Sequence, residues 1–193
     1  MVISAQRAIL ELIADKAREE LSPYLIRELR SDHAGETGAV YIYRGITAIA
    51  RLYRDQELLD FAKHHGDTEA QHLALIEGWL EPSARSRLLG PWCLAGWLTG
   101  ALPALFGRRS VYATIAAVET FVDQHYQQQI DYLQQFTGPA ELLQLLERCQ
   151  ADEQDHRDEA ANQLTRPLSW ILRLWCAIVG SGSAAAVILA RRI

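Results

Sequence analysis

The chain has 193 residues, of which 49% are hydrophobic, and a formal net charge of −5 at pH 7. This length suits one domain, and we expect residues 1–193 to form a single domain with short additions. The acidic balance argues against nucleic acid as a partner, because binding it requires basic side chains that release counterions from phosphate. The three cysteines form no CxxC pair and are odd in number, which favours free thiols in a reducing compartment.

Residues 1–21 are predicted to form a helical extension of the domain. Apolar residues recur there with the period of a helix, as at Ile9 and Ile13. Acidic residues interrupt the apolar stretch, so the segment is not a secretory signal. Ser22 and Pro23 then have the form of a helix N-cap followed by proline at the first helical position.

The next helix is expected to run from about Pro23 to about Tyr53. It contains three glycines, each of which weakens a helix by up to about 1 kcal/mol relative to alanine. Glycine also permits close approach of a neighbouring helix. We therefore expect a second helix to pack closely against this one at some of these positions: Gly35, Gly38 and Gly45.

A pattern of glutamates and histidines occurs twice in the chain. In each copy a single glutamate is followed by a Glu-x-x-His motif, after 33 residues in the first copy and after 34 in the second. Residues i and i+3 lie on one helix face with Cβ atoms about 5–6 Å apart, so such a pair can share a metal. The set is Glu36, Glu69 with His72, Glu119, and Glu153 with His156. This is the ligand pattern of di-iron carboxylate bundles.

The breaks between helices fall midway between the paired glutamates. Two antiparallel helices bring Glu36 level with Glu69 if the chain turns near residue 52 or 53, and residues 51–55 form a polar break there. For the second copy the midpoint lies at residue 136, and Gly138-Pro139 is a strong breaker beside it. Each arm is then about 25 Å long. The sequence therefore predicts an all-α, ferritin-like four-helix bundle.

Two apolar segments, 88–107 and 167–193, lie outside the repeat. Their length just suffices to cross a bilayer. Prolines and glycines are expected to break the first segment, and Arg173 lies inside the second. We therefore predict two additional helices at a membrane interface, anchored by tryptophan and flanking arginine. The alternatives are ordinary buried helices and a hairpin through the bilayer.

The predicted site has chemistry suited to two metal ions. Four carboxylates and two neutral imidazoles leave two divalent cations near charge neutrality, and an oxygen-rich set favours iron or manganese over zinc. Two metals about 3.5–4 Å apart can bind a diatomic molecule between them. We expect the two motif glutamates, Glu69 and Glu153, to bridge the metals. Each metal is then completed by one further pair: Glu36 with His72, and Glu119 with His156. The alternative is a set of surface glutamates and incidental histidines.

Other polar residues are candidates for supporting roles. Asp152 is expected to accept the second N–H of a ligating histidine, the alternative being an ordinary surface aspartate. Tyr43 and Tyr126 each follow a single glutamate by seven residues and so share its helix face. They are candidates for lining a substrate cavity or for transferring an electron or proton, with core packing as the alternative. His125 points about 120° away from Glu119 and is a weaker candidate. The remaining histidines are expected to be structural or exposed: His33, His64 and His65.

Three sequence strings resemble one known family, the demethoxyubiquinone hydroxylases. They are residues 31–36 (SDHAGE) with Gly38-Ala39, residues 117–119 (AVE) leading to His125-Tyr126, and Asp152-Glu153 with His156. The DHAGE string is the most distinctive, and the resemblance runs from about residue 24 to the C-terminus.

This resemblance implies a ferritin-like fold with two iron ions per chain. It also implies peripheral attachment to the cytoplasmic side of the cell membrane. The implied reaction is the O2-dependent hydroxylation of a polyprenylated methoxy-methyl-benzoquinol in ubiquinone biosynthesis, with reducing equivalents from NADH. A lipid-presenting protein partner and a homo-oligomer are compatible with it.

Two other functions share part of the pattern. A ferritin-like peroxidase or ferroxidase would use the same ligands but needs no lipid-facing helices. A non-catalytic bundle that binds a prenyl lipid would retain the lipid after its metal is removed.

Overall fold

The computed structural model describes residues 21–136 and 138–193, and this part of the chain is helical without strands. The prediction of an all-α protein is confirmed for these residues. The helical extension expected in residues 1–21 falls, apart from Leu21, outside them. In chain order the elements are α2 (Pro23–Tyr53), α3 (Gln56–Trp79), η1 (Pro82–Ala84), α4 (Leu89–Ala104), α5 (Arg108–Gln135), α6 (Ala140–Asn162) and α7 (Trp170–Ala190).

Local capping fixes where α2 and α3 begin. The Ser22 hydroxyl accepts a hydrogen bond from the Leu25 amide at 3.2 Å, as its position before proline predicts. After α2, Arg54 adopts a left-handed conformation with φ of 55°, which ends the helix. The Asp55 carboxylate then accepts from the Leu58 amide at 3.1 Å and starts α3. The break predicted at residues 51–55 is confirmed.

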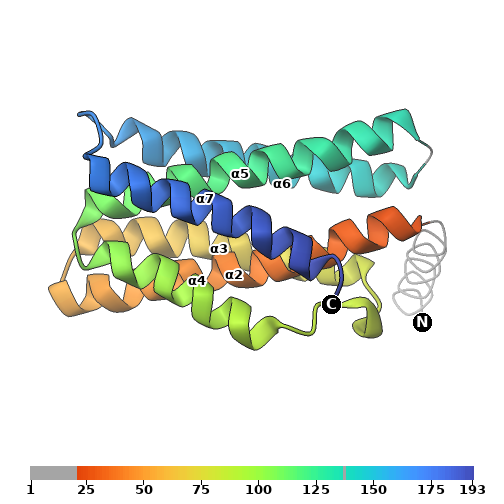
Figure 1. Ribbon diagram of the computed structural model, residues 1–193, viewed down its shortest axis with the longest axis horizontal. Coiled ribbons are helices and arrows are strands. Elements are labelled where there is room, and N and C mark those ends of the chain that lie inside the picture. Colours follow the sequence, from red (N-terminus) through yellow and green to blue (C-terminus); the bar gives the residue numbers. More distant parts are fainter. Residues whose placement is uncertain (1–20, 137) are drawn as a thin grey trace, which may run out of the picture.

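The four longest helices form two antiparallel hairpins, α2 with α3 and α5 with α6 (Figure 1). The second hairpin turns between Gln135 and Ala140, where Gly138-Pro139 predicts a break. Arg108, at the start of α5, donates from Nε to both carboxylate oxygens of Asp55, at 2.9 and 2.7 Å. This contact ties the two hairpins together at one end.

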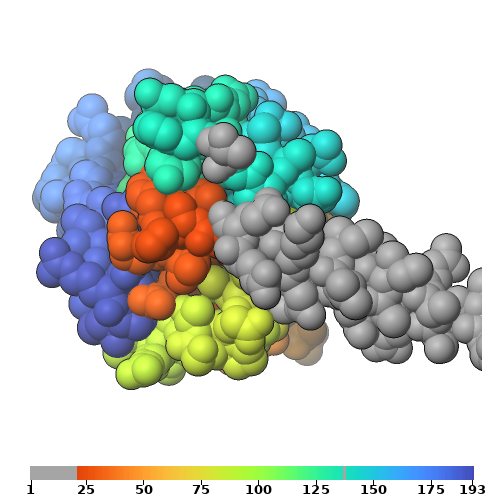
Figure 2. Space-filling model, turned by 90° about the vertical axis from the view of Figure 1, so that its right-hand side faces the viewer, coloured from red at the N-terminus to blue at the C-terminus, as the bar shows by residue number. Residues whose placement is uncertain are grey.

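The shorter helices α4 and α7 cover the outer side of the hairpins. α4 packs mainly against α2, and α7 packs against α5 and α2 (Figure 1). Viewed from the end, the start of α2 lies between the α5–α6 turn and the segment that follows α3, with the end of α7 beside it (Figure 2). The residues at 88–107 and 167–193 that were expected to be helical do form helices, α4 and α7.

Glycines bring the backbones of α2 and α4 into direct contact. A Cβ atom on Gly96 would overlap the backbone carbonyl of Gly38, and one on Gly100 would overlap that of Ile42. On α2, a Cβ on Gly45 would overlap the Trp97 carbonyl. The expected close approach is thus confirmed at Gly45, and the backbone of Gly38 also contacts α4, although a Cβ on Gly35 or Gly38 would itself meet nothing within 4 Å.

The prolines do not break the first apolar segment, contrary to expectation. Pro91 lies in the first turn of α4, where amide groups have no partner within the helix. Pro103 lies in the last turn, so its ring disturbs little of the helix. One continuous helix therefore covers Leu89–Ala104.

Two apolar cores lie at the two ends of the hairpins. One includes Ile46, Leu58 and Ile115, and the other includes Leu29, Ile76 and Leu142. Each core joins residues from both hairpins. The chain positions between them carry the buried polar residues, so a polar layer lies between two apolar ones.

Among the described residues, α7 is the one helix long and apolar enough to cross a membrane by length and composition. Its 21 residues are largely uncovered, since 6% of its most apolar window is buried. α4 has 16 residues, or about 24 Å, which is short of a bilayer core. Large apolar side chains are exposed on both: Leu94, Trp97, Leu98 and Leu102 on α4, and Trp170, Ile171, Leu174, Ile178, Ile188 and Leu189 on α7.

Because α2 and α4 are in backbone contact, replacing glycine with alanine should lower the stability only at the contact positions. Gly100→Ala forces its Cβ against the Ile42 carbonyl, so we expect a loss of about 1–3 kcal/mol in the free energy of unfolding. Gly78→Ala on α3 is the matched control because open space surrounds it. It should be neutral or stabilise by about 0.5–1 kcal/mol, as for other helical glycines. Denaturant unfolding of both variants measures the difference; equal stability would contradict the contact.

Candidate metal centre

Six side chains from four helices meet in the polar layer between the two apolar cores. All six are buried, with relative exposures of 1–4%. Since α2 and α3 are antiparallel, as are α5 and α6, the paired residues in each hairpin lie at the same depth. The residues are Glu36 from α2, Glu69 and His72 from α3, Glu119 from α5, and Glu153 and His156 from α6.

These side chains form two overlapping groups of potential ligands. One atom from each member of a group lies within 4.8 Å of those from the others. Glu69 and Glu153 belong to both groups, and they are the residues that the sequence pattern predicts to bridge two metals. The groups are Glu36, Glu69, His72 and Glu153, and Glu69, Glu119, Glu153 and His156.

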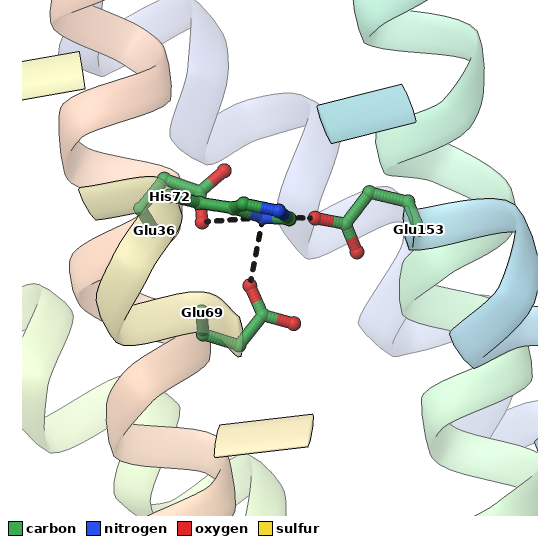
Figure 3. A group of neighbouring side chains, drawn as sticks. All are labelled: Glu36, Glu69, His72 and Glu153. Carbon is green, nitrogen blue, oxygen red and sulfur yellow. Dashed lines mark hydrogen bonds and ion pairs between the residues drawn. The ribbon is translucent and has the colours of Figure 1, made fainter. Parts of the chain in front are cut away.

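Both histidines direct Nδ1 toward the shared carboxylates. His72 Nδ1 lies 3.1 Å from Glu153 Oε1, and 3.8 Å from both Glu36 Oε2 and Glu69 Oε2 (Figure 3). His156 Nδ1 lies 3.2 Å from Glu69 Oε1 and 3.4 Å from Glu153 Oε2. Spacings of 3–4 Å are those expected of atoms that ligate a common cation at about 2 Å.

Several of these inward-facing atoms have no aligned hydrogen bond. Each of these buried atoms lacks a hydrogen-bond partner, which lowers the stability of the folded protein by about 1–3 kcal/mol per group. Cations at the centre of the cluster would satisfy them together, and oxygen with imidazole is a donor set that iron and manganese accept. The unsatisfied atoms are Glu36 Oε2, Glu69 Oε1, Glu153 Oε2 and His156 Nδ1. The residues present therefore fit a pair of divalent metal ions.

The electrostatics of the cluster indicate the same requirement for positive charge. Burial, with the charge of Glu69, raises the pKa of Glu36 well above its usual value; burial, with the charge of Glu153, does the same for Glu119. Burial also favours a high pKa for Glu153, but contacts with His156 and His72 outweigh it and lower the pKa to about 2.

The two histidines respond in the opposite direction. Although burial alone would lower it, the neighbouring carboxylates raise the pKa of His72 to about 10, and that of His156 to about 9. Without cations, protons therefore supply the positive charge. Metal ions would displace those protons on binding.

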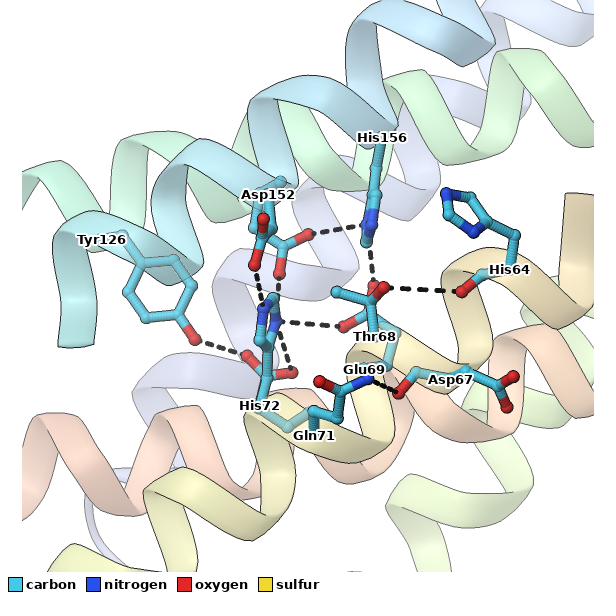
Figure 4. Close-up of polar contacts among 11 residues, drawn as sticks. His64, Asp67, Thr68, Glu69, Gln71, His72, Tyr126, Asp152 and His156 are labelled. Atoms are coloured by element: carbon cyan, nitrogen blue, oxygen red, sulfur yellow. Dashed lines mark hydrogen bonds and ion pairs between the residues drawn. The ribbon is translucent and has the colours of Figure 1, made fainter.

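Asp152 contacts the outer side of His72. Its Oδ2 atom lies 3.0 Å from His72 Nε2, which leaves Nδ1 to face the carboxylates (Figure 4). The equivalent position in the first motif is Thr68, whose hydroxyl donates to the His64 carbonyl at 3.5 Å. The two halves of the cluster thus differ on their outer side.

The two tyrosines that share a helical spacing have different surroundings. The Tyr126 hydroxyl donates to Glu36 Oε1 (Figure 4). Tyr43 is also buried, but its hydroxyl has no aligned hydrogen bond, and its ring lies 6.5 Å from that of His156. The structure therefore places Tyr126 in direct contact with Glu36, and Tyr43 near Glu119. Burial, with the charge of Glu119, raises the pKa of the Tyr43 hydroxyl well above its usual value.

An apolar cavity of about 360 Å³ adjoins the cluster. All four carboxylates of the cluster line it at one side, and Tyr126 lies next to them. The remaining walls come from α2, α4, α5 and α7, with small or apolar residues that include Gly38, Gly96, Val118, Trp175 and Val179. The cavity therefore extends from the carboxylates to the helices that expose apolar side chains.

A second set of polar residues, centred on His125, lines this cavity. Its spacing from Glu119 along the helix made His125 a weaker candidate in the sequence. His125 Nε2 lies 3.0 Å from Asp32 Oδ1 and 3.0 Å from Ser31 Oγ, and both His125 and Asp32 line the cavity. Gln129 donates to Asp32 at 2.9 Å. The sequence feature that could have indicated this contact is Asp32, which precedes Glu36 by one turn and so shares its helix face.

The three histidines expected to be structural or exposed lie outside the cluster. His33 is buried, with Nε2 3.2 Å from Glu77 Oε1. His64 is exposed. His65 is buried, and its ring centroid lies 4.2 Å from that of His156.

Comparisons with known proteins place the chain in a family. Residues 23–190 match the family model described as "Ubiquinone biosynthesis protein COQ7". The 3-demethoxyubiquinol 3-hydroxylase of Rhodospirillum rubrum is 34% identical over 164 residues, covering 80% of this chain and 76% of that protein.

Two eukaryotic relatives are named NADPH-dependent 3-demethoxyubiquinone 3-hydroxylase, mitochondrial. The one from Dictyostelium discoideum is 29% identical, covering 84% of this chain and 78% of its own. The one from Mus musculus is 31% identical, covering 86% and 76%. These matches confirm the resemblance found in the sequence. The chain belongs to the family of the ubiquinone biosynthesis protein COQ7.

Proposed function

We propose that this protein hydroxylates a polyprenylated demethoxyubiquinol, with O2 as co-substrate and two iron ions per chain as cofactor, in a ferritin-like single domain. The observation that carries the proposal is the buried Glu/His cluster at one side of an apolar cavity. The relatives' names support it, because they specify 3-hydroxylation of demethoxyubiquinol or demethoxyubiquinone.

The six residues of the cluster have distinct proposed roles. Glu69 and Glu153 would be shared by the two ions, because they belong to both ligand groups. Each ion is completed by one further glutamate and one histidine: Glu36 with His72, and Glu119 with His156. A ferrous pair, when bound, supplies the electrons and the open coordination positions that O2 activation requires.

The residues around the cluster hold its ligands in place. Asp152 fixes the His72 ring by accepting from Nε2, so Nδ1 stays directed inward. Tyr126 donates to Glu36 Oε1, which leaves the other oxygen, Oε2, free for a cation. Tyr126 touches a proposed ligand and lines the cavity beside it, so it is our candidate for proton or electron transfer. Tyr43 lines no part of this cavity, but its buried hydroxyl lies near Glu119, so it is a second candidate for the same role.

The cavity provides a place for the quinol ring. Its walls are apolar, so they exclude water from the ring and from the cluster. His125 is one polar group among these walls that can hydrogen-bond a ring hydroxyl, and Asp32 and Ser31 hold its orientation. The prenyl tail then passes between α4 and α7 toward lipid.

The reaction needs electrons from outside the described site. One oxygen atom enters the ring and the other leaves as water, which consumes two electrons. The sequence resemblance implies NADH as their source, whereas the two eukaryotic relatives are named NADPH-dependent. We propose a reduced nicotinamide as the donor.

We further propose that α4 and α7 lie at the membrane interface, on the cytoplasmic side of the cell membrane. Both expose large apolar side chains. α7 is fixed along the bundle near both of its ends: Trp175 Nε1 donates to Thr114 Oγ1 at 2.8 Å, and Arg191 donates to Glu28 Oε2 at 2.9 and 2.7 Å. Helices held against the bundle in this way suit a peripheral position better than a span.

A ferritin-like peroxidase or ferroxidase is the main rival function. It would need the cluster but neither the apolar cavity nor the exposed faces of α4 and α7. A lipid-binding bundle without catalysis would need the cavity but not the cluster. Both features occur together here, which favours hydroxylation of a lipid-borne ring.

Isotope labelling tests the reaction directly. The iron-loaded protein, incubated with demethoxyubiquinol, a reductant and ¹⁸O2, should yield a product that carries one labelled oxygen atom on its ring. Mass spectrometry of the quinone measures this, and H2¹⁸O with unlabelled O2 is the control. Label from water, or peroxide consumption without ring oxidation, would contradict the proposal.

Removal of a proposed bridging carboxylate should abolish the metal centre. Glu153→Ala deletes an oxygen donor that both ligand groups share, so we expect the protein to lose stoichiometric iron, with fewer than two ions per chain. Glu147→Ala is the matched control because Glu147 is exposed on the same helix. Metal analysis of the purified proteins measures the stoichiometry. Two irons per chain in Glu153→Ala would refute the bridging role.

Charges on the apolar faces should release the protein from lipid. Ile171→Glu with Leu174→Glu places two carboxylates on the exposed face of α7, outside the cavity walls. We expect binding to phosphatidylcholine vesicles to fall at least tenfold, given about 1.5–3 kcal/mol for burying each such side chain. Leu52→Glu with Leu75→Glu, exposed on α2 and α3, is the control. Vesicle co-sedimentation measures both, and equal losses would contradict the proposed membrane face.

A further inference from the structure

We propose that a polar groove between α3 and α6 is the route by which divalent cations reach the metal centre, and that His65 and Glu159 bind the cation on the way. The inference rests on the metal centre put forward under the proposed function. The groove lies beside the cluster, and the half-buried Asp152 and the buried His156 both line it.

The groove is lined by acidic and imidazole side chains. Asp152, Asp155 and Glu159 contribute carboxylates from α6, and His64 and His65 contribute rings from α3. His64, Thr68, Asp152 and His156 surround this side of the cluster in Figure 4. His156 is common to both sites, because its ring lines the groove while its Nδ1 faces Glu69 and Glu153.

His65 is the feature that indicates a ligand rather than a merely acidic surface. It is 1% exposed, and neither of its ring nitrogens has an aligned hydrogen bond. Buried polar atoms are seldom left in this state. Its Nε2 lies 3.2 Å from Glu159 Oε2, but the two atoms are not oriented for a hydrogen bond. The distance suits two ligand atoms that share one cation.

The position of His65 connects the groove to the centre. Its ring centroid lies 4.2 Å from that of His156, and the two rings meet edge to face. A cation held by His65 and Glu159 therefore lies beside His156, which is itself one of the six proposed ligands.

The charges of the groove favour the approach of a cation. Among the described residues, no lysine or arginine lines it. Arg157, the nearest arginine in sequence, is paired with Asp123 and Asp158. Asp155 and Glu159 are exposed. A cleft lined by one sign of charge raises association rates by about 10–10³-fold.

The opposite side of the cluster is unsuitable for this task. The cavity there is apolar, and transfer of a hydrated dication through apolar surroundings carries a large desolvation cost. It is also the cavity that we assign to the quinol. Separate polar and apolar sides let metal and substrate reach the cluster independently.

The rate of metal uptake tests this route separately from the metal centre. Anaerobic Fe²⁺ is mixed with metal-free protein at low salt, and uptake is followed by stopped-flow spectroscopy. Asp155→Asn with Glu159→Gln should slow uptake at least tenfold, while the final content stays at two ions per chain. The matched control is Asp131→Asn with Glu141→Gln, which removes two charges from α5 and α6 outside the groove. The control should match the wild type, and the difference should shrink as salt rises.

A second variant tests His65 itself. His65→Phe keeps an aromatic ring against His156 and Phe61 but removes both nitrogens. It should slow uptake at an unchanged final content, with helicity checked by circular dichroism. Wild-type uptake rates in both groove variants would overturn the route, and a wild-type rate in His65→Phe alone would overturn the role of His65. A wild-type protein that holds no iron at equilibrium would refute the metal centre, and the route with it.

Discussion

The confinement of four carboxylates to one buried layer is the constraint on which the rest of the structure depends. Their mutual repulsion and desolvation must be offset by positive charge, and histidines at the third position after two of the glutamates supply part of it. The apolar cores on both sides keep water from this layer. Without metal, such a layer is stable only if protons bound to the glutamates and histidines neutralise the carboxylate charge.

The two sides of this layer have opposite character. Toward α4 and α7 the structure offers a small-residue, apolar cavity, made possible by glycine contacts that draw α4 onto α2. Toward α3 and α6 it offers an acidic groove with a buried, unsatisfied imidazole at His65. In the functions that we propose, a lipid-soluble substrate and a hydrated cation would thus approach the layer from sides of opposite polarity.

Much of this arrangement could be predicted because helices have a fixed rise per residue. The nearly equal spacings in the two copies, with breaks at 51–55 and near residue 136, were sufficient to predict hairpins that bring the paired glutamates level. Spacing along one helix could not predict contacts between helices. The pairing of His125 with Asp32 depends on how α5 meets α2, and so do the different surroundings of Tyr43 and Tyr126. For the same reason the sequence could not predict which of the three α2 glycines contacts a neighbouring helix.

The most direct test of the central claim is anomalous X-ray diffraction from crystals of the iron-loaded protein, recorded at the iron absorption edge. We predict two peaks about 3.5–4 Å apart within the polar layer. One should lie beside Glu36 and His72 and the other beside Glu119 and His156, with Glu69 and Glu153 between them. A single peak, or iron located elsewhere while these six side chains remain unligated, would contradict it.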